Sequence, residues 1–267
     1  MSETITFGIL LPFYHGDRLS DIKRTLRSVL SCDFSKVYIV VDGPIHHASL
    51  VYLNRVSARF DFELLHLCTN AGLGAALNFA LPYIKETYCF RIDPGDVLVQ
   101  QGVLSIMDYV RNNPQIDLVG GQMAEHLGTP DQIIGKRQVP CSAKEIRRFA
   151  KLRNPFNHIT VCFNVERAMN LGGYPEDTLA HEDYGFWIKY LQNQLNFTNL
   201  NVIVSSADVS GFSCRRSGVR YASYEFNFLI KNLSFFHIWV APYILIRLPA
   251  RASRYFSNWI YSKIRSQ

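Results

Sequence analysis

Short apolar runs and helix-spaced apolar residues alternate along the first 121 residues of the chain. Apolar runs at 6–13, 36–41, 63–68, 88–92 and 117–121 are bounded by turn residues and predict β-strands. Apolar positions three and four apart, as at Leu19, Ile22, Leu26 and Val29, predict helices, with further ones at 73–84 and 103–110. Strands that alternate with helices build a mostly parallel sheet. The predicted fold class is therefore α/β, with helices flanking the sheet.

The regular alternation of predicted strands and helices ends after residue 121, where a polar loop precedes two further predicted helices. Ser142 and Glu145 have the spacing of a capping box and predict the start of a short helix. Another helix is predicted to start near residue 181. In it Asp183 lies three, four and seven positions before the apolar residues Phe186, Trp187 and Tyr190, so this carboxylate heads an inward-facing stripe.

Composition limits the class of protein. With 267 residues and 48% apolar content, the chain can bury a large core, which excludes disordered and fibrous proteins. The six cysteines are widely separated and lack zinc-ligand spacing, so we expect reduced core cysteines. The first residues have neither the basic start nor the apolar segment of a signal peptide, and the expected location is the cytoplasm.

The C-terminal segment after Cys214 is basic and aromatic. Its charged residues are arginine and lysine except for Glu225, and they alternate with aromatic residues such as Phe235, Phe236 and Trp239. Such a mixture favours contact with an anionic membrane surface. The run 235–246 is too short to cross a bilayer, which needs about 20 apolar residues. The alternative is that the aromatic residues complete the core while the arginine heads reach solvent.

Two carboxylates, Asp93 and Asp96, follow the predicted strand 88–92 immediately after Arg91. In open α/β sheets ligands bind at the carboxyl ends of strands, where Asp93 would lie. This placement favours a metal site for a nucleotide diphosphate. The peptide Asp93-Pro94-Gly95-Asp96 also has the composition of an ordinary turn, which is the structural alternative.

Two other strand ends carry polar residues that belong on the same edge of the sheet. Asp42 ends the strand 36–41, and Asn70 begins the loop that follows the strand 63–68. Gly72 and Gly74 invite a dinucleotide-binding interpretation, but that motif needs glycine where this chain has Leu77. The alternative for the two glycines is a simple loop that leads into a helix, with Asn70 as its cap.

The polar groups of the second half also have structural alternatives. Glu182 and Asp183 would offset the positive end of a helix dipole. Arg215 and Arg216 suit a diphosphate, because the guanidinium fork matches phosphate oxygens, but they could equally be a solvated pair. His158 is more often a structural histidine than a catalyst. The acidic clusters disfavour nucleic acid as a partner, although the net charge is +6.

In order and spacing, these motifs resemble the family 2 glycosyltransferases of GT-A fold, particularly bacterial enzymes that build capsule, exopolysaccharide or O-antigen. The resemblance covers nearly the whole chain and rests on the motifs at 8–14, 40–44, 70–78, 91–96, 154–158, 172–174, 182–187 and 215–216. It implies a Rossmann-like GT-A domain at 1–212, followed by a helical, basic and aromatic extension at 213–267 that associates with the membrane.

The resemblance also implies the site residues. Pro12 and Tyr14 would frame the nucleotide base, Asp42 would bind uracil or ribose, and Arg91 with Asp93 would meet the ribose and diphosphate. Asp183 would be the general base of an inverting transfer. The other residues expected at the site are Asn70, Gly74 and Asn78 for the nucleotide sugar, and His158, Glu182, Arg215 and Arg216 for the acceptor or diphosphate.

The resemblance further implies a divalent cation, Mg²⁺ or Mn²⁺, held by Asp93 and Asp96. Here the chain departs from the family, which usually has Asp-x-Asp-Asp after the arginine, because Gly95 replaces the middle carboxylate. Val41 also stands where an acidic residue commonly precedes Asp42. The expected activity is transfer of a hexose from a UDP-sugar to a lipid-linked oligosaccharide at the cytoplasmic face of the inner membrane. The alternative is a non-catalytic GT-A subunit that binds nucleotide sugar or glycan and assists a partner transferase.

Overall fold

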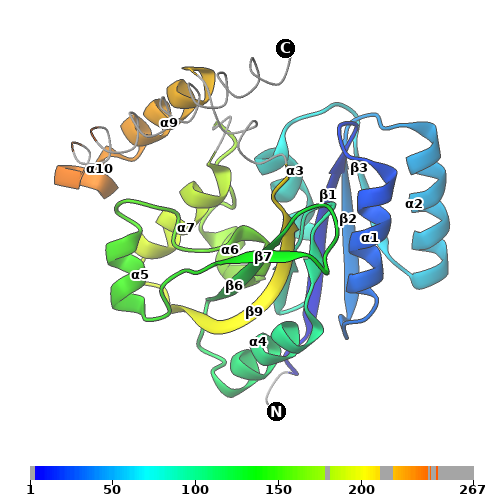
Figure 1. Ribbon diagram of the computed structural model, residues 1–267, viewed down its shortest axis with the longest axis horizontal. Coiled ribbons are helices and arrows are strands. Elements are labelled where there is room, and N and C mark those ends of the chain that lie inside the picture. The colour runs from blue at the N-terminus through cyan, green and yellow to red at the C-terminus, as the bar shows by residue number, and fades with distance from the viewer. Residues whose placement is uncertain (1–3, 178–180, 211–218, 240, 242–244, 246–267) are drawn as a thin grey trace.

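A twisted nine-stranded sheet with helices on both faces forms the described part of the chain (Figure 1). The computed structural model describes residues 4–177, 181–210, 219–239, 241 and 245. The strands are β1 Phe7–Tyr14, β2 Lys36–Asp42, β3 Glu63–Leu67, β4 Tyr88–Arg91, β5 Val97–Leu98, β6 Leu118–His126, β7 Ile133–Arg137, β8 Cys162–Asn164 and β9 Phe197–Asp208. Their order is β3-β2-β1-β4-β8-β6-β9-β5, and β7 pairs with β6.

The prediction of a mostly parallel sheet is confirmed. Strands β3, β2, β1 and β4 are parallel neighbours, and β6 is parallel to β9. Three strands that the sequence pattern did not indicate run against them: β8 between β4 and β6, β5 beside β9, and β7 beside β6. They are short or partly exposed, so they lack the long apolar runs that indicate buried parallel strands.

The helices follow the predicted spacing in most places. They are α1 Leu19–Val29, α2 His47–Phe60, α3 Leu73–Ala80, α4 Gln100–Asn112, α5 Ala143–Phe149, α6 Val165–Asn170, α7 Glu182–Gln192, α9 Val219–Lys231 and α10 Leu233–Phe236, with 3₁₀ turns at Leu81–Tyr83, His158–Thr160 and His237–Trp239. The predicted cap of α5 is confirmed, because Ser142 Oγ accepts the Glu145 amide at 3.3 Å. Helix α2 was not predicted, and helix α3 ends earlier than predicted because Pro82 leads into a 3₁₀ turn.

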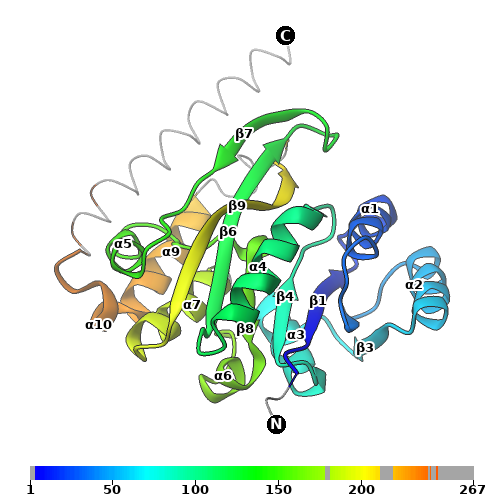
Figure 2. The same ribbon diagram turned by 90° about the horizontal axis from the view of Figure 1, so that it is seen from below.

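Successive side chains of the strands divide the core into two layers, as period-two alternation requires. Ile9 and Leu11 of β1 pack with helices α1, α2 and α4, whereas Leu10 packs on the other face with α3 and α7. Figure 2 shows the two groups of helices on opposite sides of the sheet. The inward stripe of α7 is confirmed, since Phe186, Trp187 and Tyr190 are fully buried.

The C-terminal aromatic residues do not all face outward. Phe235 and Phe236 of α10 are buried in the layer that contains α7, so for these two the expected contact with a membrane is wrong and the core alternative holds. No helix among the described residues is long and apolar enough to cross a membrane.

The described cysteines are all free thiols. Cys89 and Cys162 are buried in the sheet, where burial raises the pKa of both thiols. Cys68 is exposed, so the expectation that the cysteines are core residues is wrong there. Cys214 lies outside the described residues.

Candidate active site

The ends of β2 and β3 meet at Asp42, as the sequence predicted. The buried carboxylate accepts hydrogen bonds from the amides of Ala71 at 2.7 Å and Gly72 at 3.0 Å, and Asn70 Nδ2 bonds the Asp42 carbonyl at 3.2 Å. Gly43 has a φ of 80°, and a Cβ there would lie 2.5 Å from Asn70 N. Asp42 therefore holds the loop that begins at Asn70 against its own strand.

The end of β1 presents one of the two residues expected at the base. Pro12 is buried and pairs with Val40 of β2. Tyr14 is exposed, and its amide donates to Asp17 Oδ2 at 3.0 Å. Tyr14 is thus the residue of this pair that a ligand can reach.

Arg91, at the end of β4, is fully buried and forms an ion pair with Asp93. Burial is the largest single influence and alone would lower the pKa of the guanidinium, but the charge of Asp93, its hydrogen bond and the charges of Tyr174 and Glu182 together raise it. Among the described residues, Nε and Nη2 of Arg91 have no hydrogen-bond partner. Buried N–H donors without partners carry a desolvation cost of about 1–3 kcal/mol each. The arginine can therefore donate to an anionic ligand.

Two further carboxylates lie near Arg91 at the start of α7. Burial, and then the charge of Asp183, raise the pKa of Glu182 to about 7, while the charge of Arg91 opposes this shift. Asp183 Oδ2 accepts a hydrogen bond from Asn154 Nδ2 at 2.7 Å, and Oδ1 accepts the Tyr184 amide at 2.8 Å. The end of β4 and the start of α7, far apart in sequence, thus form one charged cluster.

Asn78 and Gly74, both expected to bind nucleotide sugar, fasten α3 to the turn at 172–175. Asn78 Nδ2 donates to the Tyr174 carbonyl at 2.8 Å, and Asn78 Oδ1 accepts the Tyr174 amide at 2.7 Å. A Cβ on Gly74 would lie 2.7 Å from the Pro175 carbonyl oxygen. Close packing alone accounts for both residue types at these positions.

His158 lies against two buried aromatic residues, Tyr174 and Trp187. Its ring centroid is 5.8 Å from that of Tyr174 and 6.0 Å from that of Trp187. Tyr174 is buried, which raises the pKa of its hydroxyl, and among the described residues neither Tyr174 Oη nor Trp187 Nε1 has a hydrogen-bond partner. Arg215 and Arg216, expected to contact the diphosphate, lie outside the described residues.

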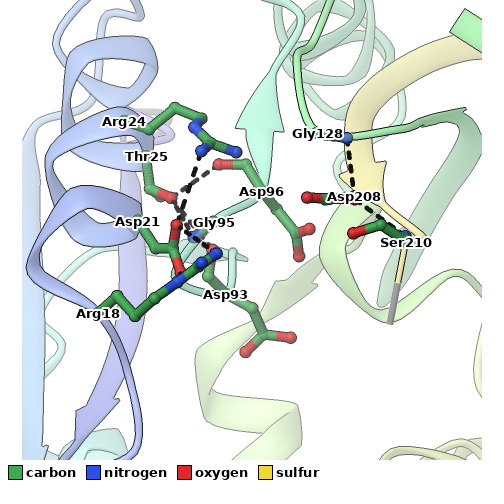
Figure 3. Close-up of polar contacts among 10 residues, drawn as sticks. All are labelled: Arg18, Asp21, Arg24, Thr25, Asp93, Gly95, Asp96, Gly128, Asp208 and Ser210. Carbon is green, nitrogen blue, oxygen red and sulfur yellow. Dashed lines mark hydrogen bonds and ion pairs between the residues drawn. The ribbon is translucent and has the colours of Figure 1, made fainter. Parts of the chain in front are cut away.

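The peptide from Asp93 to Asp96 is a turn, as its composition indicated. The Asp96 amide donates to the Asp93 carbonyl at 3.2 Å, and Gly95 has a φ of 97°, as glycine allows at the third position of a type II turn. Thr25 of α1 supports the turn from outside: its hydroxyl donates to the Asp96 carbonyl at 2.7 Å and accepts the Gly95 amide at 2.9 Å (Figure 3). The turn thus presents the side chains of Asp93 and Asp96.

Three residues at the site were not assigned roles from the sequence. Asn154 was noted only as part of a motif, and Thr25 and Asp208 were not noted. Asp208 ends β9 and accepts the amides of Gly128 at 3.2 Å and Ser210 at 2.9 Å. Within the described ranges, no group of three His, Cys, Asp or Glu side chains is arranged to hold a metal ion. A cation here would need additional oxygen ligands.

No protein-family model matches the chain. Three curated proteins are similar to it. An uncharacterized glycosyltransferase of Haemophilus influenzae is 30% identical over 222 residues, covering 82% of each chain. The UDP-Gal:alpha-D-GlcNAc-diphosphoundecaprenol beta-1,3-galactosyltransferase of Escherichia coli is 28% identical, covering 98% of this chain and 97% of its own. The amylovoran biosynthesis glycosyltransferase AmsE of Erwinia amylovora is 24% identical, covering 82% of each chain.

Solved glycosyltransferase structures share the fold. The mannosyltransferase PcManGT of Pyrobaculum calidifontis, in complex with GDP-Man and Mn²⁺, aligns with a TM-score of 0.68 at 15% identity, covering 98% of this chain and 76% of its own. TarS 1–349 of S. aureus, in complex with UDP-GlcNAc, aligns with a TM-score of 0.63 at 18% identity, covering 76% of this chain and 58% of its own. At these identities the likeness establishes the fold alone.

Proposed function

The chain belongs to the family 2-type glycosyltransferases of GT-A fold, and we propose that it transfers a hexose from a UDP-sugar to a lipid-linked oligosaccharide with inversion. The observation that carries this proposal is the meeting of two motifs around a buried arginine. Arg91 pairs with Asp93 on one side and interacts with the charge of Glu182, beside Asp183, on the other. A donor diphosphate and an acceptor hydroxyl both need groups of these kinds.

The donor would bind at the carboxyl ends of β1, β2 and β4. Tyr14 is exposed there, the loop at 70–72 is ordered by Asp42, and Arg91 has two donors that lack a partner among the described residues and suit phosphate oxygens. The E. coli relative is named for a UDP-Gal donor, and the TarS structure is in complex with UDP-GlcNAc. Both support a UDP-sugar.

Asp183 would act as the general base. Its carboxylate would take the proton of the acceptor hydroxyl, whose oxygen would form a bond to the anomeric carbon. The bond from that carbon to the diphosphate oxygen would break on the opposite side, and the diphosphate would leave with the electron pair. Asn154 holds the Asp183 carboxylate in one orientation. Glu182, Arg215, Arg216 and His158 belong to the acceptor and diphosphate side of this proposal.

The carboxylates presented by the 93–96 turn have the hard oxygen donors that Mg²⁺ and Mn²⁺ prefer. Asp93 and Asp96 fit such a cation, and the PcManGT structure is in complex with Mn²⁺. A bound cation would neutralise negative charge on the leaving diphosphate. Arg91 Nε and Nη2, which have no partner within the described ranges, would share that task.

The proposed acceptor supports a location at the cytoplasmic face of the inner membrane. The name of the E. coli relative includes a diphosphoundecaprenol acceptor, and the basic, aromatic segment 213–267 suits an anionic lipid surface. We assign catalysis to residues 1–212 and membrane association to the extension.

The test combines UDP-sugars with lipid-diphosphate oligosaccharide acceptors and compares three proteins: the wild type, Asp183→Asn, and the control Asp108→Asn at an exposed position on α4. We expect product from the wild type and the control, and a loss of about 100- to 10,000-fold in Asp183→Asn. Equal activity in all three would contradict the role of Asp183.

A second candidate is a non-catalytic subunit, which the glycine at position 95 favours because the family usually has an acid there. It predicts UDP binding without turnover by any of the three proteins, and UDP affinity that does not respond to Mn²⁺.

A further inference from the structure

A cationic cavity lies away from the candidate active site, where α5, the end of α7 and α10 meet. Its volume is about 230 Å³, far more than the roughly 10–15 Å³ that a single water needs. The residues that line it are Arg147 and Lys151 of α5, Leu191 and Gln192 of α7, and Ser234 and Phe235 of α10. Leu191 follows Asp183 by eight positions, which places the cavity about 12 Å along α7 from the proposed general base.

Arg147 and Lys151 join the walls of the cationic cavity through backbone carbonyls. Arg147 Nη1 donates to the Leu191 carbonyl at 2.6 Å, and the guanidinium lies 4.7 Å from the ring centroid of Phe197. Lys151 Nζ donates to the Phe235 carbonyl and lies 3.6 Å from the centroid of the Phe235 ring. Guanidinium and ammonium groups each have more N–H donors than these contacts use. Both cations can therefore also donate to an anion in the cavity.

No acidic side chain among the described residues pairs with either cation. The acid nearest in sequence, Glu145, accepts the Ser142 hydroxyl at 2.7 Å at the start of α5. Burial lowers the pKa of Lys151, and no charge among the described residues opposes that shift. In the rest of the sequence the only acidic side chain is Glu3, two positions before Ile5, which packs on the other face of the sheet. The positive charge of the cavity thus favours an added anion.

The rim of the cationic cavity adjoins an exposed apolar surface. Ser234 is exposed and directly follows Leu233, which is exposed together with Ile230 of α9. Figure 1 and Figure 2 show α5, α9 and α10 at the same end of the molecule, opposite α1 and α2. Cationic groups beside exposed apolar side chains are typical of a surface that lies at the boundary between lipid headgroups and acyl chains. This setting favours a phosphate carried by a lipid over a soluble phosphate.

We propose that the cationic cavity binds the phosphate of an anionic phospholipid headgroup, with Arg147 and Lys151 as cationic partners and Ser234 as a further hydrogen-bond donor. The guanidinium fork matches phosphate oxygens, and the ammonium adds a point charge. This inference rests on the membrane contact in the proposed function and extends it to α5, outside the C-terminal extension. The lipid would hold the proposed catalytic part, residues 1–212, against the bilayer.

The test is cosedimentation with vesicles of phosphatidylglycerol and phosphatidylcholine, and with vesicles of phosphatidylcholine alone. The wild type is compared with the double variant Arg147→Gln, Lys151→Gln and with the control Arg55→Gln, Arg59→Gln, which removes the same charge from exposed positions on α2. We expect the double variant to bind the phosphatidylglycerol vesicles about 10- to 30-fold more weakly than the wild type, at about fivefold for each charge. The control should match the wild type, and all three should bind phosphatidylcholine alone equally weakly.

Glutamine also alters the contacts with the Leu191 and Phe235 carbonyls, so a second variant changes the charge of the cavity and keeps both cations. Ser234→Asp adds a carboxylate at the exposed rim and should weaken binding to the phosphatidylglycerol vesicles about fivefold. Ser234→Asn keeps a donor without the charge and should match the wild type. Melting temperatures check the fold of each variant. Binding by Ser234→Asp equal to that of the wild type would overturn the inference.

Other outcomes separate the lipid from its alternatives. Equal losses in the double variant and the α2 control would assign binding to overall charge and overturn the inference. Calorimetric titration of inorganic phosphate is the second arm: saturable binding that the double variant loses, without vesicle binding by the wild type, would assign the cavity to a soluble phosphate and overturn the lipid.

Transfer to a water-soluble acceptor separates this inference from the proposed function. All variants should keep the wild-type rate on that acceptor, because we assign none of the changed residues a role in transfer. Normal transfer together with unchanged vesicle binding in both cavity variants would overturn the lipid site alone. Vesicle binding that depends on the cavity, in a protein that transfers no sugar to any acceptor, would overturn the proposed transfer and support the lipid site.

Discussion

Asn154 Nδ2 lies 2.7 Å from Asp183 Oδ2, and this hydrogen bond orients the carboxylate that we propose as the general base. Asn154→Ala should lower kcat by about 10- to 100-fold with little change in the donor KM, because misplacing a catalytic group by about 1 Å can cost about 100-fold. Steady-state kinetics measure this split. In an Asp183→Asn background the same change should have no further effect. An equal loss in both backgrounds would show that Asn154 acts independently of Asp183.

Glu182 should make stability depend on pH. Its pKa is raised to about 7, first by burial and then by the charge of Asp183, whereas in the unfolded chain it is near 4.3. Between these values only the unfolded state releases the proton, so the folded state loses stability as the pH rises from about 4 to about 7. Urea unfolding should show Glu182→Gln more stable than the wild type by up to about 4 kcal/mol above pH 7, at about 1.4 kcal/mol per pKa unit.

The difference between Glu182→Gln and the wild type should shrink toward zero near pH 4, where Glu182 is neutral in both states. Glu63→Gln, at an exposed position on β3, is the matched control and should follow the wild type throughout. A constant difference across this pH range would mean that Glu182 does not titrate as stated.

Thr25 should be required for the shape of the 93–96 turn. It is fully buried, and its hydroxyl bonds the Asp96 carbonyl and the Gly95 amide. Thr25→Val keeps the volume but leaves both groups without that partner, so we expect a loss of about 2 kcal/mol in unfolding free energy. Weaker UDP binding should accompany it. Thr25→Ser keeps the hydroxyl and is the control; equal losses in both variants would assign the effect to packing.

Replacing Gly95 should not restore the family's metal site. Its φ of 97° is a conformation that side chains with a Cβ disfavour by about 1–2 kcal/mol, although a Cβ would meet only Asp21 at 3.6 Å. Gly95→Ala and Gly95→Asp should therefore both lower the melting temperature, and Gly95→Asp should not tighten Mn²⁺ binding. Tighter binding in Gly95→Asp would show that the turn can change its backbone to bring in the missing carboxylate.

The rule that parallel strands present their carboxyl ends at one edge of the sheet predicted which motifs lie together. Asp42 and the loop at Asn70 meet as expected, because strand ends of a parallel sheet are fixed by topology. The contacts that the sequence did not reveal all join elements distant along the chain. Thr25 reaches a turn some 70 positions away, and Asp208 faces that turn through the antiparallel strand β5. A single threonine or aspartate has no local sequence pattern from which a contact with a distant segment could be predicted.

Amino-acid composition also did not predict where some side chains lie. Aromatic residues of the C-terminal segment were expected at a lipid surface, yet Phe235 and Phe236 are buried, and the amino-acid types alone do not distinguish the two outcomes. Asn78 and Gly74 likewise match a binding motif, while their observed contacts fasten α3 to the turn at 172–175.

Helix α9 and the start of α10 present an outward apolar stripe that suits the proposed membrane contact. Phe226, Ile230 and Leu233 follow one another at spacings of four and three and are 45%, 47% and 45% exposed. An exposed apolar stripe near basic residues is typical of a helix that lies at a lipid surface. We therefore expect these side chains to enter the headgroup region of the membrane.

The double variant Phe226→Gln, Ile230→Gln should bind anionic phospholipid vesicles at least about tenfold more weakly, because each buried apolar side chain contributes about 1.5–3 kcal/mol. Cosedimentation measures this binding. Phe60→Gln is the control, since Phe60 is similarly exposed at 40% but lies on α2, at the opposite end of the molecule in Figure 1. The double variant should retain turnover of a short-chain, water-soluble acceptor, because both side chains are about half exposed and we assign neither a role in the site. If the double variant bound vesicles as tightly as the wild type, the proposal that α9 contacts the membrane would be wrong.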